Sequence, residues 1–223
     1  MPWPNLPTKK EPGWFRTRDL FGCRAYPFVT FSRPMPETEA GFPRRGTPFT
    51  RALAHRLLAL GGWRVEGALP HEPRFVIIVA PHTSNWDFLI GVLAMFGVGV
   101  RLNWLGKHTL FRPPFGWIMR RWGGIPVDRS ASHDVVPQII ASFSSRPRVF
   151  LVITPEGTRK QVSRWKTGFW HIAKGAGVPI VPIAFDWGSR VIHILPAFTP
   201  RETVDQDVAE LQSRYAGIRG RTR

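Results

Sequence analysis

The chain has 223 residues, enough for one α/β domain with a substantial core, and its 31 Lys and Arg against 15 Asp and Glu give a formal charge of +16. This excess predicts attraction to polyanions, namely nucleic acid, an anionic bilayer surface or phosphorylated substrates. Cys23 is the sole cysteine, which excludes an internal disulfide and a cysteine-built zinc site and is typical of a reducing compartment.

Residues 1–46 are rich in Pro, Arg and aromatic side chains and show no steady helical or strand period. We expect an irregular basic arm there, with Met35 as an alternative start, followed by a single domain over residues 47–223. The beginning of the sequence lacks the charged, apolar, small-residue order of a secretory signal. The longest apolar stretch, residues 88–100, is shorter than the roughly 20 residues that span a bilayer. We therefore expect any membrane contact to be at one face.

The first expected helix covers residues 47–60, with Thr50 as its cap and Gly61-Gly62 at its end. Its leucines gather on one side. They either pack on the core or dip into a bilayer.

Short apolar runs then alternate with helical periods through the rest of the chain. Expected strands cover residues 63–66, 75–80, 102–105, 149–154, 180–185 and 191–195. Expected helices cover residues 86–96, 115–122, 134–144, 169–176 and 204–216. This alternation predicts a mostly parallel central sheet flanked by helices on both faces.

A polar turn, residues 81–87, follows the expected strand 75–80 and leads into a helix. Within one helix, five positions would place His82 and Asp87 about 140° apart, so they meet only if His82 lies before the helix. The preceding proline and the three capping-type residues that follow favour this arrangement. A neutral His82 held by Asp87 in the first helical turn can accept a proton from a hydroxyl. The alternative is a plain capping turn with His82 at the surface.

A second polar turn, residues 154–160, ends another buried strand and can open at the same edge of the sheet. Gly157 allows close approach of a backbone, Thr158 offers a hydroxyl, and Arg159 offers a planar fork suited to phosphate oxygens. The alternative is a solvated turn of ordinary composition.

Between these turns, residues 106–129 combine cations with apolar side chains. Lys107, Arg112 and Arg129 would add positive charge near the same edge, while Phe, Trp and Ile side chains supply apolar surface. This combination suits a phosphate-bearing molecule with an acyl chain. Solvated surface charge is the alternative for each cation.

Four blocks of the chain together resemble the lysophospholipid acyltransferases, the glycerolphosphate acyltransferase superfamily. The blocks are His82-x4-Asp87, residues 107–116 with Asp128-Arg129, Pro155-Glu156-Gly157-Thr158-Arg159, and Val178-Pro179-Ile180-Val181-Pro182-Ile183. The similarity spans about residues 60–198, and the order and spacing of four blocks are more specific than any single block.

The resemblance implies transfer of a fatty acyl group from acyl-CoA or acyl carrier protein to the hydroxyl of a lysolipid acceptor. It implies His82 as the general base and Asp87 as the residue that orients it, with no serine or cysteine nucleophile. The acceptor oxygen then attacks the thioester carbonyl directly. Positioning of the substrates and stabilisation of the oxyanion supply the part of the rate enhancement that the base does not. No metal or redox cofactor is expected.

The same resemblance places residues 156–159, that is Glu156, Gly157, Thr158 and Arg159, in the acceptor-binding block, with Arg159 as phosphate ligand and Lys166 assisting it. The sequence departs from the family's pattern at two places, of which the first lies at a strand end and is expected to be tolerated, and the second concerns the acceptor. Thr154 stands where the family often has phenylalanine, and Lys107-His108-Thr109-Leu110 lacks the acid of the family's Lys-x-Glu-Leu. A lyso-amino-lipid or another hydroxylated amphiphile therefore stays open beside a glycerolphosphate lipid.

A rival interpretation is a basic, non-catalytic module that binds nucleic acid or a membrane surface. The charge and the basic arm favour it, whereas the aromatic residues mostly fall inside expected helices and strands. An esterase would normally carry a Gly-x-Ser-x-Gly elbow, which the sequence lacks. We expect a cytoplasmic O-acyltransferase that lies peripherally on the inner face of an anionic membrane, through residues 47–60 and 111–122, without a nucleic-acid partner.

Overall fold

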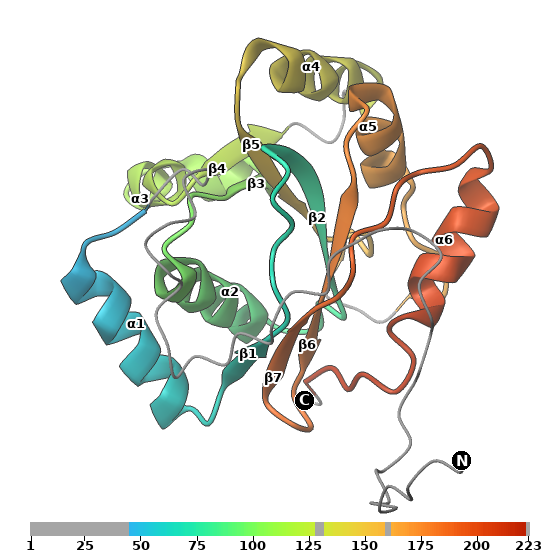
Figure 1. Ribbon diagram of the computed structural model, residues 1–223. Coiled ribbons are helices and arrows are strands. Elements are labelled where there is room, and N and C mark those ends of the chain that lie inside the picture. The colour runs from blue at the N-terminus through green and yellow to red at the C-terminus, as the bar shows by residue number, and fades with distance from the viewer. Residues whose placement is uncertain (1–44, 128–131, 159–161, 222–223) are drawn as a thin grey trace, which may run out of the picture.

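The computed structural model describes residues 45–127, 132–158 and 162–221. The expected basic arm lies outside these residues except for Arg45 and Gly46, and so does Met35. The described residues form an α/β fold around a seven-stranded sheet (Figure 1). The strands are β1 (Arg64–Glu66), β2 (Arg74–Ala80), β3 (Asn103–Lys107), β4 (Gly124–Val127), β5 (Val149–Ile153), β6 (Ile180–Asp186) and β7 (Val191–Ile194).

Of the described helices, one precedes the first strand, one follows the last strand, and the others lie in connections between strands. The helices are α1 (Pro48–Leu60), α2 (Asn85–Val98), the 3-10 helix η1 (His108–Phe111), α3 (Gly116–Arg121), α4 (Ser132–Ser145), α5 (Gly168–Ala176) and α6 (Val204–Ser213). The strand order is β1-β7-β6-β2-β5-β3-β4. Neighbouring strands pair in parallel except β6 and β7, which are antiparallel, so the expected mostly parallel sheet is confirmed.

The central strand β2 shows why helices cover both faces of the sheet. Residues 75–80 are all buried, as a strand of a covered parallel sheet requires. Phe75, Ile77 and Val79 belong to the core under α1 and α2, whereas the alternate residues belong to the core under α4, α5 and α6. In Figure 1 these two groups of helices lie on opposite sides of the sheet.

The expected helices and strands are all present, with ends shifted by a few residues. Two further elements, β4 and η1, were not expected. β4 contains Gly124 and Pro126, which weaken a strand signal, and it is an edge strand, where proline is tolerated.

The prediction that Thr50 caps the first helix is wrong, because the cap is Thr47. The N–H of Thr50 donates to Thr47 Oγ1 (3.2 Å), and the N–H of Thr47 donates to Thr50 Oγ1 (2.8 Å). This reciprocal pair is a capping box, with Pro48 at the first helical position. Two threonines three residues apart give the same sequence signal, and only residue 47 has the extended backbone of a cap.

Helix length also bears on membrane contact. Among the described residues, no helix is both long and apolar enough to cross a bilayer.

Candidate active site

Three adjacent parallel strands end at one edge of the sheet and place three polar side chains there. β2 lies between β5 and β6 and pairs with both in parallel. His82 comes shortly after β2, Glu156 shortly after β5, and Trp187 directly after β6. The carboxyl ends of parallel strands are where open α/β sheets form binding crevices. The two polar turns identified in the sequence therefore lie side by side.

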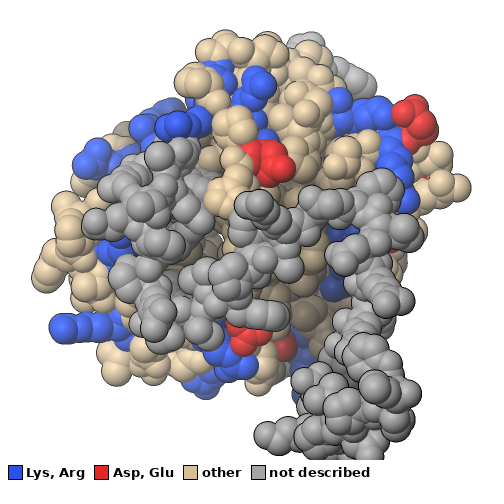
Figure 2. All heavy atoms as spheres, in the orientation of Figure 1, with Lys and Arg blue, Asp and Glu red and all other residues tan. Residues whose placement is uncertain are grey.

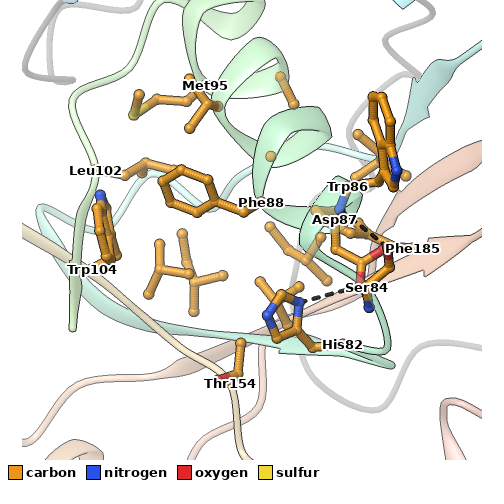
Figure 3. A pocket seen from close by; sticks show the side chains of 18 of the residues that line it. His82, Ser84, Trp86, Asp87, Phe88, Met95, Leu102, Trp104, Thr154 and Phe185 are labelled. Atoms are coloured by element: carbon orange, nitrogen blue, oxygen red, sulfur yellow. Dashed lines mark hydrogen bonds and ion pairs between the residues drawn. The ribbon is translucent and has the colours of Figure 1, made fainter. Parts of the chain in front are cut away.

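His82 and Asp87 are in contact, because His82 precedes α2 and Asp87 lies in its first turn. His82 Nδ1 is 3.2 Å from Asp87 Oδ2, and the two side chains are 19% and 0% exposed respectively. Figure 3 shows the imidazole at the edge of a cavity, with its ring turned toward the start of α2. The sequence predicted this contact from the position of the helix start.

The carboxylate of Asp87 accepts hydrogen bonds on both oxygens. Oδ2 accepts the backbone N–H groups of Thr83 (2.8 Å) and Ser84 (2.7 Å), in addition to its contact with His82. Oδ1 accepts the indole N–H of Trp187 (2.7 Å). Ser84 is the N-cap of α2, so Asp87 also completes a capping box. Capping the helix and orienting the histidine are thus done by one carboxylate.

These contacts fix the chemistry of the imidazole. An ionised carboxylate only accepts hydrogen bonds, so the proton of a neutral His82 lies on Nδ1, facing Asp87. Nε2 then carries the lone pair and is the atom that can take a proton from a bound hydroxyl.

Glu156 has a different place from the one the sequence suggested. It was expected to bind substrate, but it is 6% exposed and does not belong to the lining of the cavity. Its Oε2 accepts the backbone N–H of His82 at 2.7 Å, which ties the two turns together. Burial raises the pKa of Glu156 above its ordinary value, and the hydrogen bond from His82 N opposes that rise.

A cavity of about 1200 Å³ extends from His82 between α2 and the sheet. Its mouth is polar, with His82, Thr83, Ser84 and Thr158 at its edge. Further in, the lining is apolar and comes from α2 and from the sheet, as Figure 3 shows for Phe88, Met95, Leu102, Trp104 and Phe185. A long apolar pocket that opens beside a base is suited to an extended hydrocarbon chain.

The other expected site residues are only partly brought together. Lys107, at the end of β3, lines the cavity, as do Gly157 and Thr158. Arg112 is exposed and is not among the residues that line the cavity.

Lys166 lies just behind the second turn. Gly157 has φ +63°, and a Cβ there would come within 3.0 Å of Lys166 Cδ, so the lysine side chain packs against this glycine. The backbone N–H of Lys166 donates to Pro155 O (2.8 Å). Arg129 and Arg159 lie outside the described residues.

Trp187 and Arg221 were missed by the sequence analysis. The Arg221 guanidinium carbon lies 5.1 Å from the ring centre of Trp86 and 5.0 Å from that of Trp187, and Arg221 also lines the cavity. The one signal for Trp187 was its position directly after a buried strand. Nothing in the local sequence of Arg221 indicated its place.

In the part of the chain that the structure describes, no group of three or more His, Cys, Asp or Glu side chains is arranged to hold a metal ion.

Comparison with known proteins gives one family. A family model described as "Acyltransferase" matches residues 64–186, more than half of the chain. The 1-acyl-sn-glycerol-3-phosphate acyltransferase of Escherichia coli K12 is 29% identical over 148 residues, which cover 62% of this chain and 59% of that protein. The enzyme of the same name from Haemophilus influenzae is 32% identical over 139 residues, covering 57% and 56%. The chain thus spans less than two thirds of the length of these relatives.

The fold has a solved counterpart. The crystal structure of the 1-acyl-sn-glycerophosphate acyltransferase PlsC from Thermotoga maritima superimposes with a TM-score of 0.53 and 19% sequence identity, over 75% of this chain and 79% of that one. At this identity the match concerns the fold alone.

Proposed function

The chain belongs to the acyltransferase family, and on that premise we propose that it moves a fatty acyl group from an acyl thioester to the hydroxyl of a lysolipid. A 1-acylglycerol-3-phosphate-like lipid is the favoured acceptor, as the names of the relatives suggest. The observation that carries this proposal is the His82–Asp87 contact at the mouth of a long apolar cavity.

His82 is the proposed general base. Nε2 accepts the proton of the acceptor hydroxyl while the oxygen of that hydroxyl attacks the carbonyl carbon of the thioester. The tetrahedral intermediate then expels the thiolate. The thiolate accepts the proton from Nε2 and leaves as a thiol, which returns His82 to its neutral form. Asp87 holds the ring and stabilises the imidazolium between the two steps. Base catalysis of this kind contributes about a hundredfold to ten-thousandfold.

The oxyanion of that intermediate needs hydrogen-bond donors other than the backbone N–H groups of the polar turn 81–87. The backbone N–H of His82 donates to Glu156, and those of Thr83 and Ser84 donate to Asp87. These three groups are therefore committed to carboxylates, and stabilisation of the oxyanion falls to other groups at the cavity mouth.

The apolar part of the cavity is the proposed site of the acyl chain. Each buried methylene contributes about 0.8 kcal/mol, so a pocket of this kind favours long chains over short ones. The end of the chain near His82 would carry the carbonyl carbon, which places the reacting bond beside Nε2.

The acceptor head group is proposed to lie between β3 and the second turn. Lys107 supplies a positive charge and Thr158 a hydroxyl at the cavity. By its place in the Glu-Gly-Thr-Arg motif, Arg159 is the proposed phosphate ligand. Arg129 and Lys166 would add positive charge around it.

Contact with the membrane is proposed on the side of α1 and α3. Leu60 on α1 is 84% exposed and Trp117 on α3 is 68% exposed. Other large apolar side chains are exposed on or next to the same two helices, namely Phe49, Leu53, Leu57 and Phe115. Arg120 and Arg121 are exposed beside Trp117. In Figure 2 Lys and Arg gather at the upper left, where α3 lies, and no described acidic residue is visible among them. An anionic bilayer surface matches this mixture of apolar and basic groups.

The rival role as a non-catalytic nucleic-acid module accounts for the charge but not for the site. Such a module needs no buried Asp87 that orders a histidine, and no apolar cavity beside it. It predicts salt-sensitive binding of nucleic acid without turnover.

The test is a substrate matrix. The purified full chain is incubated with labelled acyl-CoA or labelled acyl carrier protein, and with 1-acylglycerol-3-phosphate, other lysophospholipids and lyso-amino-lipids in mixed micelles. We expect labelled diacyl product when one of the two donors, acyl-CoA or acyl carrier protein, is combined with the phosphate-bearing acceptor 1-acylglycerol-3-phosphate. Absence of transfer in every combination, with the chain folded, contradicts the proposal.

A further inference from the structure

Trp187 lies directly beyond residues 64–186, which the family model matches, yet it contacts the site itself. Its indole Nε1 is 2.7 Å from Asp87 Oδ1. The other oxygen of the same carboxylate faces His82. The two side chains therefore act on opposite ends of one carboxylate.

The contact fixes how the carboxylate is turned. Thr83 and Ser84 both donate to Oδ2, and Trp187 adds a donor on Oδ1. Rotation of the carboxylate about its Cβ–Cγ bond moves both oxygens, so the donor on Oδ1 adds to the resistance to that rotation and helps to set the direction in which Oδ2 meets His82 Nδ1. Groups that hold an orienting carboxylate in this way act on the reaction through it.

Trp187 is itself held from several sides. Its ring meets that of Trp63 edge to face, with centres 4.9 Å apart, and its backbone N–H donates to Arg219 O (2.8 Å). On its other side the guanidinium of Arg221 lies 5.0 Å from its ring. The hydroxyl of Thr83 donates to Arg221 O (3.2 Å), which connects residues 219–221 to the polar turn 81–87 that contains His82. Trp187 is partly buried, and these contacts favour the orientation in which its indole N–H points at Asp87.

We propose that Trp187 is a positioning residue for acyl transfer, acting through Asp87 on His82, and that residues 219–221 hold it in place. This inference rests on the proposed function.

The charged groups around His82 decide what loss of the indole N–H does. Asp87 on α2 and Glu156 after β5 contact His82, and Lys107 at the end of β3 and Arg221 line the same cavity. The indole N–H draws charge toward Oδ1. Without it, more of the negative charge stays on Oδ2, the oxygen that faces His82 Nδ1.

The experiment compares Trp187→Phe with Trp170→Phe. Trp170 is a matched control, because its Nε1 also donates to a buried aspartate, Asp207, at 2.9 Å, but on the other face of the sheet. We expect Trp187→Phe to lower kcat about tenfold to a hundredfold, as loss of a hydrogen bond to a charged group does, with little change in KM. The acid limb of its kcat/KM profile should move to higher pH. Trp170→Phe should change the melting temperature but not that limb.

A folded Trp187→Phe protein with the wild-type kcat and pH profile overturns the inference. A second measurement on the wild-type protein covers the case in which this variant does not fold. The indole proton resonances of Trp187 and Trp170 are followed by NMR through the pH range of the acid limb. We expect that of Trp187 to move and that of Trp170 to stay, and a fixed Trp187 resonance overturns the inference.

The two proposals fail in different ways. A wild-type chain that transfers no acyl group contradicts the proposed function, whereas the NMR titration still reports whether Trp187 is coupled to His82.

Discussion

Asp87 performs two tasks that are usually separate, because its carboxylate caps α2 and also faces His82. Its burial makes this arrangement dependent on the donors that surround it. A buried carboxylate without partners would be strongly unfavourable, and here Thr83, Ser84 and Trp187 all donate to it.

Replacement of Asp87 by asparagine tests this double task. The amide has a similar shape but only one accepting oxygen, so it cannot serve the backbone donors, His82 and Trp187 together. We expect acyl transfer to fall by about a hundredfold to ten-thousandfold, measured as the initial rate with labelled donor. Asp205→Asn is the control, since Asp205 is an exposed acid in the first turn of α6. Equal rates for wild type and a folded Asp87→Asn protein would count against the role of Asp87.

The buried carboxyl group of Glu156 should make the stability of the fold depend on pH. Burial raises its pKa above the ordinary 4.5, so the folded chain holds this proton more tightly than the unfolded chain does. The free energy of unfolding therefore loses a contribution as the pH rises from about 4.5 through the raised pKa. Glu156→Gln keeps an acceptor for the N–H of His82 but cannot ionise. Urea unfolding between pH 4 and pH 8 should show the stability of the variant gaining on that of wild type as the pH rises, and parallel curves would contradict this.

At the scale of elements, the apolar period of each segment was enough to predict the helices, most strands and the parallel sheet. The contact between His82 and Asp87 could also be predicted, because it follows from where α2 begins. Local sequence did not reveal the orientation of Glu156, since the direction of a turn side chain depends on what the neighbouring turn offers. Trp187 is 100 residues from Asp87 and meets it only because β6 pairs with β2.

Helix α2 forms one wall of the proposed acyl site, which predicts the effect of filling it. Ala94 lines the cavity, so Ala94→Phe should shorten it. We expect the preferred donor to shift toward shorter acyl chains, measured as relative kcat/KM over a chain-length series. Ala141→Phe is the matched control, because Ala141 is exposed on α4, across the sheet. An unchanged chain-length profile for Ala94→Phe would place the acyl chain elsewhere.

The charge of +16 and the exposed apolar residues of α1 and α3 are the basis of the proposed membrane-facing side. The substrate would then reach the cavity from the bilayer rather than through water. Positive charge raises the rate and strength of binding to anionic lipid, and added salt weakens both.

The helix α1 offers a direct test of this orientation. Phe49 and Leu60 are 74% and 84% exposed, so replacing both with glutamate removes apolar surface and adds negative charge without opening the core. We expect less of the protein to sediment with anionic vesicles, while its melting temperature stays close to that of wild type. Ala141→Glu serves as the control for added charge on the opposite side of the sheet. Equal sedimentation of all three proteins would argue against this face.

The proposed function requires that the chain transfers acyl groups with His82 as the base. The most direct measurement is the transfer rate of wild type, His82→Ala and His171→Ala with both labelled donors and 1-acylglycerol-3-phosphate. His171 is an exposed histidine on α5, away from the cavity, and controls for loss of an imidazole. We predict transfer by wild type and His171→Ala, and a fall of at least about a hundredfold for His82→Ala. Transfer at the wild-type rate by a folded His82→Ala protein would contradict the account.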